Sequence, residues 1–457
     1  MEQNQPSFLF ASSFFVLFVG VMIVSMFLLQ TDPHMPLIVS LVLILGAAKR
    51  LGYKWEQLEE GLLTGIQTGI KPMLILMLVG VVIAVWMMSG TVPTLLFYGL
   101  QLISPEWFAV SALTVCIFVS TFTGSSFTTI GTIGVAMMGI GAALGVNPAL
   151  AAGAIICGAC FGDKMSPLSD TTNFAPGIVG VELFAHIRHL LWTTVPALAI
   201  TYLLFLFLGQ GGSGDLPNVS AMLSSLEASF TVSALALLSP LLVVVLAAKR
   251  YPVLPVLVAG IVTGLLTAMF LQGEYSLGSV FNVMQSGFER ETGNELIDEI
   301  VQAGGLQSMM WSISLIFIAL ALGGVAQKIG LIESLFQHLS RFLSKRGHLI
   351  ASTAAGSISV NLMTGEQYLS ILLPGKTFQS YYEKLGLQMK NLSRTLEDAG
   401  TLVNPLIPWG VSGAFFAQTL GVPVVDYLPY AFFLFLSPVF TLVYGYTGIG
   451  MGREAQN

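Results

Sequence analysis

The sequence predicts an all-α polytopic membrane protein made of two inverted repeats of about five transmembrane helices, each with a re-entrant hairpin and a broken helix. Three observations carry this prediction: the composition, a polar pattern that occurs once in each half, and an uneven distribution of basic residues. Of the 457 residues, 54% are hydrophobic and 9% are charged, whereas a soluble domain carries about 25% charged residues. The sequence has no basic face interleaved with aromatic residues, so nucleic-acid binding has no support.

The polar pattern is a Thr-Gly pair followed by a polar stretch in apolar surroundings. The pairs are Thr123-Gly124 and Thr364-Gly365, and the polar stretches that follow them lie at 162–173 and 397–406. A duplicated membrane chain with a broken polar segment in each half is typical of secondary transporters. We therefore expect a first repeat at 1–208, a Gly-rich linker at 209–229 and a second repeat at 230–457.

Apolar segments that can cross a bilayer, which takes about 20 residues, occur throughout both halves. Shorter segments must gain residues from their flanks. The expected spans of the first half are 8–30, 36–48, 72–89, 149–161 continuing past a break, and 191–208. Those of the second half are 230–248, 252–271, 306–326, a broken span near 398–418, and 427–446.

The segments around the two Thr-Gly pairs are expected to form hairpins. Residues 107–121 and 125–146 are apolar on either side of a polar tip, and 348–387 form the counterpart. Irregular backbone at membrane depth is tolerated only where protein buries it or water reaches it, so we expect Gly124 and Gly365 near the midplane, within reach of water. Amphipathic stretches at 55–71, 92–103, 281–304 and 331–343 are interpreted as interfacial helices.

The basic residues test this topology. With two hairpins and an inverted second half, nearly all loop Lys and Arg residues fall on one side, which the positive-inside rule makes cytoplasmic. The other side carries Arg290 among acidic residues at 274–299. Both termini are therefore expected in the cytoplasm, with the chain in the cytoplasmic membrane. The cytoplasmic set is Lys49, Arg50, Lys54, Arg188, Lys249, Arg250, Lys328, Arg341, Lys345, Arg346, Lys384, Lys390, Arg394 and Arg453.

Charges inside a membrane are costly and usually functional. Asp163 and Asp170 flank Pro167, which interrupts the helix and frees backbone carbonyls. Carboxylates, carbonyls and hydroxyls are hard oxygen ligands suited to Na⁺, Li⁺ or Ca²⁺, and a carboxylate can also accept a proton. We expect a site where Na⁺ and H⁺ compete; the structural alternative is that Asp163 pairs with Lys164 or another cation. The hydroxyl and amide groups of this stretch belong to Ser166, Ser169, Thr171, Thr172 and Asn173.

The two tips complete the expected ion pathway. Gly permits a tight turn, and the helix after each tip points its positive dipole end inward. Glu366 breaks the symmetry, because the first tip has Ser in the corresponding place. We assign the metal ligands to Asp163, Asp170, Thr171, Thr172 and Glu366, and the pathway to Thr123, Gly124, Ser125, Ser126, Lys164, Ser166, Ser169, Asn173, Thr364, Gly365, Asp398 and Asn404.

The second break, the cysteines and the histidines are interpreted as follows. Asp398 and Asn404 mirror the first break without a second Asp, so the primary site is expected at the first break. Cys157 and Cys160 form a C-x-x-C motif, but their small apolar neighbours favour helix packing. The five histidines are expected at loops or interfaces, including His186 and His189 at the surface.

At these residues the chain resembles the NhaC family of Na⁺/H⁺ antiporters. The resemblance rests on TFTGSSFTTIGTIG at 121–134, GDKMSPLSDTTN at 162–173 and NPLIPWG at 404–410, and it spans nearly the whole chain. It implies two inverted repeats and a homodimer that moves a transport domain across a scaffold like an elevator. Close relatives of the family exchange malate and lactate, and these motifs do not separate the two activities.

The first interpretation is therefore a secondary active Na⁺/H⁺ antiporter that extrudes Na⁺ in exchange for H⁺ and uses no cofactor. The alternative is a Na⁺/H⁺-coupled exchanger of malate, lactate or another organic acid, in which Lys164 or Lys376 would hold the small carboxylate. An intramembrane enzyme is disfavoured, because no His-Glu cluster or Ser-His pair lies at membrane depth.

Overall fold

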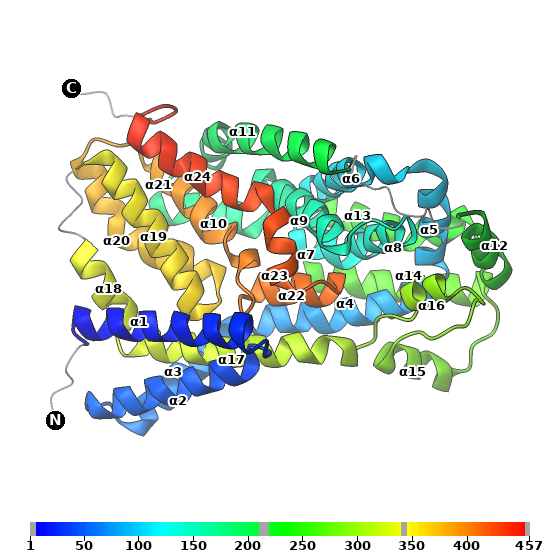
Figure 1. The fold of residues 1–457 in the computed structure, drawn as a ribbon, viewed down its shortest axis with the longest axis horizontal. Helices are drawn as coiled ribbons and strands as arrows, with labels where there is room; N and C mark the ends of the chain where they lie inside the picture. The colour runs from blue at the N-terminus through cyan, green and yellow to red at the C-terminus, as the bar shows by residue number, and fades with distance from the viewer. Residues whose placement is uncertain (1–5, 210–218, 340–344, 453–457) are drawn as a thin grey trace.

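The computed structural model describes residues 6–209, 219–339 and 345–452, and these ranges are helical throughout, without a strand. Seven described helices are long and apolar enough to cross a membrane, or up to ten if each of three bent pairs is one span. Most helices run along the long axis of the molecule (Figure 1). This confirms the expected all-α polytopic membrane fold.

The helices of the first half follow the expected order. Near the N-terminus, a π-helical turn at Val24–Leu28 extends the first helix over most of the expected span. The α-helices are α1 (Phe8–Ile23), α2 (His34–Arg50), α3 (Trp55–Thr68), α4 (Ile70–Met88), α5 (Thr91–Leu102), α6 (Phe108–Thr123), α7 (Ser126–Thr129), α8 (Val135–Ala143), α9 (Pro148–Met165), α10 (Asp170–Val179) and α11 (Leu183–Gly209).

The second half is helical in the same manner. The α-helices are α12 (Val219–Ser229), α13 (Leu238–Ala248), α14 (Val253–Leu271), α15 (Leu277–Ser286), α16 (Glu295–Val301), α17 (Met310–Lys328), α18 (Leu331–Leu339), α19 (Arg346–Thr364), α20 (Gln367–Lys384), α21 (Met389–Leu396), α22 (Val411–Leu420), α23 (Val424–Tyr427) and α24 (Phe432–Thr447).

The expected break in the first half is present. Helices α9 and α10 meet at a bend of 45°. Asn147 caps the start of α9, where Pro148 occupies the first helical position and needs no amide partner. After the interruption at Pro167, Ser169 caps α10 by accepting a hydrogen bond from Thr172 N at 3.4 Å. Local sequence chemistry thus produces the break and restarts the helix.

The second break is more extended. Helix α21 continues into a π-helical turn at Glu397–Thr401, and a short 3₁₀ turn at Asn404–Leu406 precedes α22. π-helical turns occur frequently at functional sites. Every side chain in the range 391–400 is buried, so this irregular backbone lies inside the protein, as membrane depth requires.

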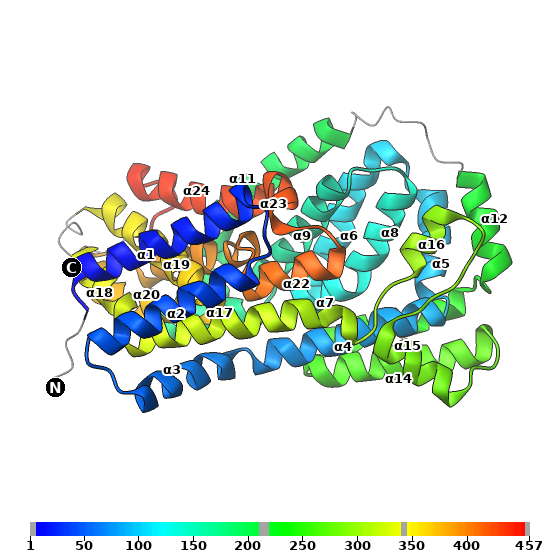
Figure 2. The ribbon, with the colours of Figure 1, turned by 60° about the horizontal axis from the view of Figure 1, so that its bottom comes forward.

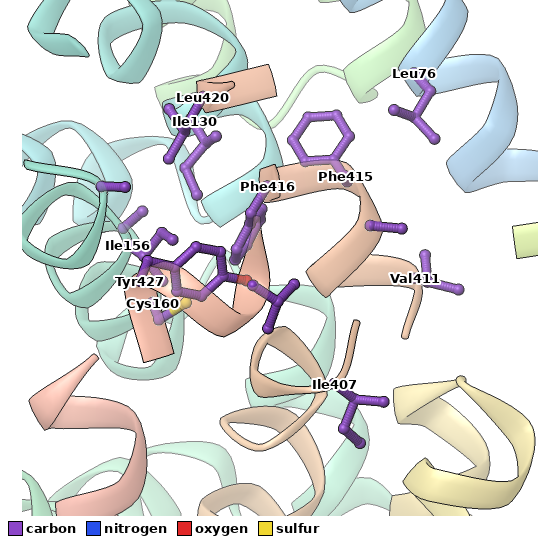
Figure 3. Packing of buried hydrophobic residues seen from close by; sticks show 14 of the residues in the cluster. Leu76, Ile130, Ile156, Cys160, Ile407, Val411, Phe415, Phe416, Leu420 and Tyr427 are labelled. Atoms are coloured by element: carbon purple, nitrogen blue, oxygen red, sulfur yellow. The ribbon is translucent and has the colours of Figure 1, made fainter. Parts of the chain in front are cut away.

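Small residues and aromatic rings form the core between the two halves. A Cβ atom on Gly158 would lie 2.4 Å from the carbonyl oxygen of Leu113, so α9 and α6 approach closely. Figure 3 shows Cys160 beside Tyr427. It also shows Phe415 and Phe416 of α22 in the region of first-half residues such as Leu76 and Ile130. All three cysteines are buried and free, which confirms the packing interpretation of the C-x-x-C motif.

Two sequence expectations differ from the structure. The stretch 55–71 was expected to be interfacial, but α3 packs on α17, where a Cβ atom on Gly65 would lie 2.8 Å from Gly324 Cα. The glycines give α3 a flat face, so it joins the helical body and runs on toward α4 (Figure 2). The span expected at 230–248 instead begins with a 3₁₀ turn at Ala234–Leu237, which Ser233 caps.

Different helices lie at the two ends of the molecule. Figure 2 shows α18 and the start of α3 at one end, and α12 and α16 at the other. Within the expected linker, residues 210–218 lie outside the described residues, and 219–229 form α12. Arg341 and Arg453 of the basic set also lie outside them.

Candidate functional site

The two tips share one backbone geometry. Gly124 and Gly365 each end a helix in the left-handed region, with φ of 67° and 66°, which an L side chain rarely adopts. The next residue caps the following helix in both cases. Ser125 Oγ accepts a hydrogen bond from Thr128 N at 3.1 Å, and Glu366 Oε2 accepts one from Leu369 N at 2.8 Å. Glu366 is therefore the structural counterpart of Ser125.

Each tip closes against the break of its own half. A Cβ atom on Gly124 would lie 2.5 Å from Leu168 Cβ, and one on Gly365 would lie 2.8 Å from the carbonyl oxygen of Trp409. Ser166 Oγ also donates to the carbonyl oxygen of Thr121 at 2.8 Å. The glycines thus allow contacts between tip and break that any larger residue would prevent.

Asp163 connects the first tip to the first break. Its Oδ2 accepts hydrogen bonds from Ser126 N at 3.0 Å and Ser126 Oγ at 2.6 Å, and the Ser169 hydroxyl is close enough to interact with it. Asp163 is half-buried, and among the described residues no cationic side chain forms an ion pair with it. Its charge is solvated by neutral donors alone.

Lys164 turns away from its neighbour. Its Nζ lies 2.5 Å from Asp398 Oδ1, both side chains are fully buried, and the ammonium lies 5.4 Å from the centre of the Phe433 ring. Asp398 Oδ2 accepts a hydrogen bond from Thr441. The expected structural alternative, an Asp163–Lys164 pair, is wrong, because consecutive helical residues point about 100° apart.

Glu397 is the residue that sequence reasoning undervalued. It begins the polar stretch 397–406 and was given no place in the expected ion pathway, but its side chain is fully buried. Thr171 Oγ1 lies 3.4 Å from its Oε1, and its Oε2 has no hydrogen-bond partner. The charges of Asp163 and Glu397 are close enough to interact. The sequence offered only the adjacency of Glu397 and Asp398, and helix packing decides which way each side chain faces.

Asp170 lies apart from this buried group. Its side chain is 65% exposed, and it forms a 3.3 Å ion pair with Lys71 at the start of α4. Its charge still acts on Asp163. Thr172 Oγ1 donates to the carbonyl oxygens of Asp163 and Lys164 at 3.0 and 3.1 Å, so it satisfies the carbonyls that the break frees.

Other predicted pathway residues hold the first break and tip together. Asn173 Nδ2 donates to the carbonyl oxygens of Pro167 and Ser169 at 2.9 and 2.7 Å. Thr123 Oγ1 lies 3.4 Å from Thr129 Oγ1. These contacts are structural, and they position the tip against Asp163.

The second break is held by amides. Asn404 Nδ2 donates to Asn361 Oδ1 and to the Gly365 carbonyl oxygen, each at 3.0 Å, and its Oδ1 accepts from Ser412 N at 2.8 Å. Asn361 in turn donates to the Gly400 carbonyl oxygen at 2.6 Å. Thr364 Oγ1 bonds to the Val360 carbonyl oxygen at 2.8 Å within its own helix. This network is neutral and internally satisfied.

Three further residues depart from expectation. His186 and His189 were expected at the surface, but both are buried and bonded to Ser393 and Asn391 at 2.8 and 3.0 Å. Arg394 is also fully buried and donates to the Gly450 carbonyl oxygen at 3.0 Å. These polar residues are buried because α11 and α21 pack against each other, a contact that the sequence pattern does not specify.

Tyr368 was not predicted. It follows the second tip, its ring packs edge-on against Phe174, and its hydroxyl lies within the electrostatic reach of four carboxylates. A tyrosine two residues after a capping residue gives no signal in the sequence by itself. The four carboxylates belong to Asp163, Asp170, Glu366 and Glu397.

A polytopic helical chain whose broken helices and helix tips meet around buried carboxylates has the architecture of a secondary transporter. Comparisons with known proteins identify the family of transporters. The sequence model of the Na⁺/H⁺ antiporter family matches residues 158–449. The chain is 66% identical over 446 residues to the Na⁺/H⁺ antiporter NhaC of Alkalihalophilus pseudofirmus, covering 96% of each chain.

Two other relatives extend the comparison. The chain is 49% identical over 449 residues to the Na⁺/H⁺ antiporter NhaC of Bacillus subtilis, covering 97% of this chain and 99% of the relative. It is 36% identical over 405 residues to the malate-2H⁺/Na⁺-lactate antiporter of Bacillus subtilis, covering 87% and 86%. The chain belongs to the Na⁺/H⁺ antiporter family, and the resemblance to NhaC is confirmed.

Proposed function

We propose that this chain is a secondary active Na⁺/H⁺ antiporter that extrudes Na⁺ in exchange for H⁺. The observation that carries the proposal is Asp163, a carboxylate at a broken helix that is held by Ser126 and has no cationic partner among the described residues. A carboxylate in that position requires a proton or a metal cation to balance its charge. Exchange follows if the two ions bind there alternately.

The proposed ligand set starts from Asp163 and the Thr171 hydroxyl. Hard oxygens are suited to Na⁺, and Thr172 organises the freed carbonyls beside Asp163. Asp170, exposed and paired with Lys71, belongs to the approach to the site. Glu366 approaches from the opposite tip, where its capping bond to Leu369 fixes one of its two oxygens.

The organic-acid exchanger is less well supported by the geometry. A carboxylate substrate needs a fixed cation, but Lys164 is neutralised by Asp398, and Lys376 is exposed on α20. Asp163 and Glu397 would repel an anion at the break. The charges at this site therefore favour a cation as the transported species.

The finer architecture belongs to the same proposal. Equal φ values at Gly124 and Gly365 and equivalent caps at Ser125 and Glu366 support two inverted repeats with hairpin tips. The predicted segregation of basic residues supports cytoplasmic termini in the cytoplasmic membrane. The homodimer follows from the family resemblance.

The test uses purified protein in proteoliposomes. A pH gradient imposed without any organic acid should drive ²²Na⁺ movement, and dissipating the gradient with a protonophore should stop it. The malate or lactate exchanger predicts movement only after the organic acid is added. Failure of the pH gradient to move ²²Na⁺, with malate or lactate restoring it, would replace the first proposal by the second.

A further inference from the structure

We propose that Glu397 is a second carboxylate ligand of the transported cation, supplied to the first break by the second half of the chain. The inference rests on the proposed function and deepens it. It makes the cation site a shared one: Asp163 belongs to the first broken helix, and Glu397 belongs to the π-helical turn of the second.

Hydroxyl groups connect the two carboxylates. Ser169 Oγ lies 3.2 Å from Thr171 Oγ1, and Thr171 Oγ1 lies 3.4 Å from Glu397 Oε1. Ser169 is also close enough to interact with Asp163. These contacts connect the first tip to the second break through side-chain oxygens.

Two buried oxygens at the second break, Glu397 Oε2 and Thr401 Oγ1, make no hydrogen bond to the rest of the described residues. The two groups are close enough to interact with each other. Both belong to the same π-helical turn. Leaving a buried charged group unpaired is costly, and either a proton on Glu397 or a bound cation removes that cost, as exchange of the two ions requires.

The cationic side chains near the two carboxylates have other partners. Lys164 is occupied by Asp398, and Arg394 is held by the Gly450 carbonyl oxygen and Met451 Sδ. Among the described residues, no cationic side chain pairs with Asp163 or Glu397. Two neighbouring carboxylates without a cation repel each other, and a Na⁺ ion between them removes that repulsion.

A purely structural Glu397 would make a different prediction. Such a residue would hold α21 against α10 through Thr171, and its loss would destabilise the protein at every Na⁺ concentration. A ligand instead couples stability to Na⁺, because an ion that binds only the folded state stabilises it by an amount that grows with the logarithm of the ion concentration above its Kd. The Na⁺ dependence of stability therefore separates the two roles.

The experiment measures ²²Na⁺ binding to purified protein and the melting temperature in NaCl against choline chloride. In the parent, Na⁺ should bind and raise the melting temperature. Glu397→Gln should weaken Na⁺ affinity at least about 10-fold and abolish the Na⁺-dependent rise. Thr401→Val, nearly isosteric, should weaken affinity by a smaller factor. The matched control is Glu60→Gln, whose exposed carboxylate pairs with Lys328, and it should bind Na⁺ as the parent does.

Unchanged Na⁺ affinity and an unchanged Na⁺-dependent rise in Glu397→Gln would overturn the inference. If Glu397→Gln does not fold, Na⁺ affinity is measured in Glu397→Asp instead. The Asp side chain is shorter by one methylene, which withdraws the carboxylate from the ion. A Na⁺ affinity equal to that of the parent would then also overturn the inference. A parent protein that binds no ²²Na⁺ would instead contradict the proposed function itself. The two failures are therefore distinguishable.

Discussion

The two tips have the same backbone and opposite chemistry. Each ends a helix at a left-handed glycine and restarts it with a side-chain cap. The first then offers the Ser126 backbone amide and hydroxyl to a carboxylate, Asp163. At the second tip, the Gly365 carbonyl oxygen accepts a hydrogen bond from the side-chain amide of Asn404. The first tip therefore contacts the carboxylate of its break, whereas the second tip carries its own carboxylate, Glu366, and contacts its break through a neutral amide network.

This difference indicates where an ion can bind in a duplicated fold. The glycines supply only shape, since both halves need a tip that packs against a break. What distinguishes the halves is charge balance: Asn404 and Asn361 satisfy each other, whereas Asp163 has only neutral donors. We infer that the first half supplies the central ligand of the ion, Asp163, and that the second half mainly stabilises the site and contributes the carboxylates Glu366 and Glu397.

The largest expected effect belongs to the buried Lys164–Asp398 pair. Asp398→Asn leaves the Lys164 charge without its partner in a site with no exposed surface, and the expected loss of unfolding free energy is about 3–5 kcal/mol. Thermal unfolding in detergent measures it. The double variant Lys164→Met with Asp398→Leu should recover most of the loss, because an apolar pair of similar volume replaces the ions. A stable single variant, or a double variant as unstable as the single, would show that this pair is not the structural anchor.

A smaller effect is expected at the neutral amide network that holds the second tip. Asn404→Leu removes the partners of Asn361, Gly365 and Ser412, and buried groups left without hydrogen bonds cost about 1–3 kcal/mol. Thr447→Ala is the matched control, because that exposed hydroxyl bonds only to the nearby backbone of Val443 and Ile449. If Asn404→Leu were as stable as Thr447→Ala, the amide network would not be what holds the second tip.

The smallest expected effect is at the exposed Lys71–Asp170 pair. Its side chains are 62% and 65% exposed, and exposed ion pairs contribute about 0–1 kcal/mol. Asp170→Asn should leave the melting temperature nearly unchanged and reduce transport far less than Asp163→Asn in the same proteoliposome assay. Equal loss of transport in both variants would place Asp170 among the inner ligands, as the sequence first indicated.

Sequence patterns predicted the features that depend on local chemistry. Pro167 predicted the first break, and the Thr-Gly pairs predicted two equivalent tips, because proline and glycine act on the backbone within a few residues. Partners distant in the sequence were not predictable in this way. Lys164 meets Asp398 from another helix, and the rotation of α21 decides that Arg394 and Glu397 face inward. Those facts require the packing of helices, which hydropathy does not specify.

The most direct test of the central claim is Na⁺-induced proton release from purified protein in weakly buffered detergent solution. The parent should release protons when NaCl is added and none when choline chloride is added, because Na⁺ displaces H⁺ at the first break. Asp163→Asn should release at least about 10-fold fewer protons, while Thr447→Ala should match the parent. Proton release from Asp163→Asn equal to that of the parent would contradict the claim that the charged first tip and its break form the exchange site.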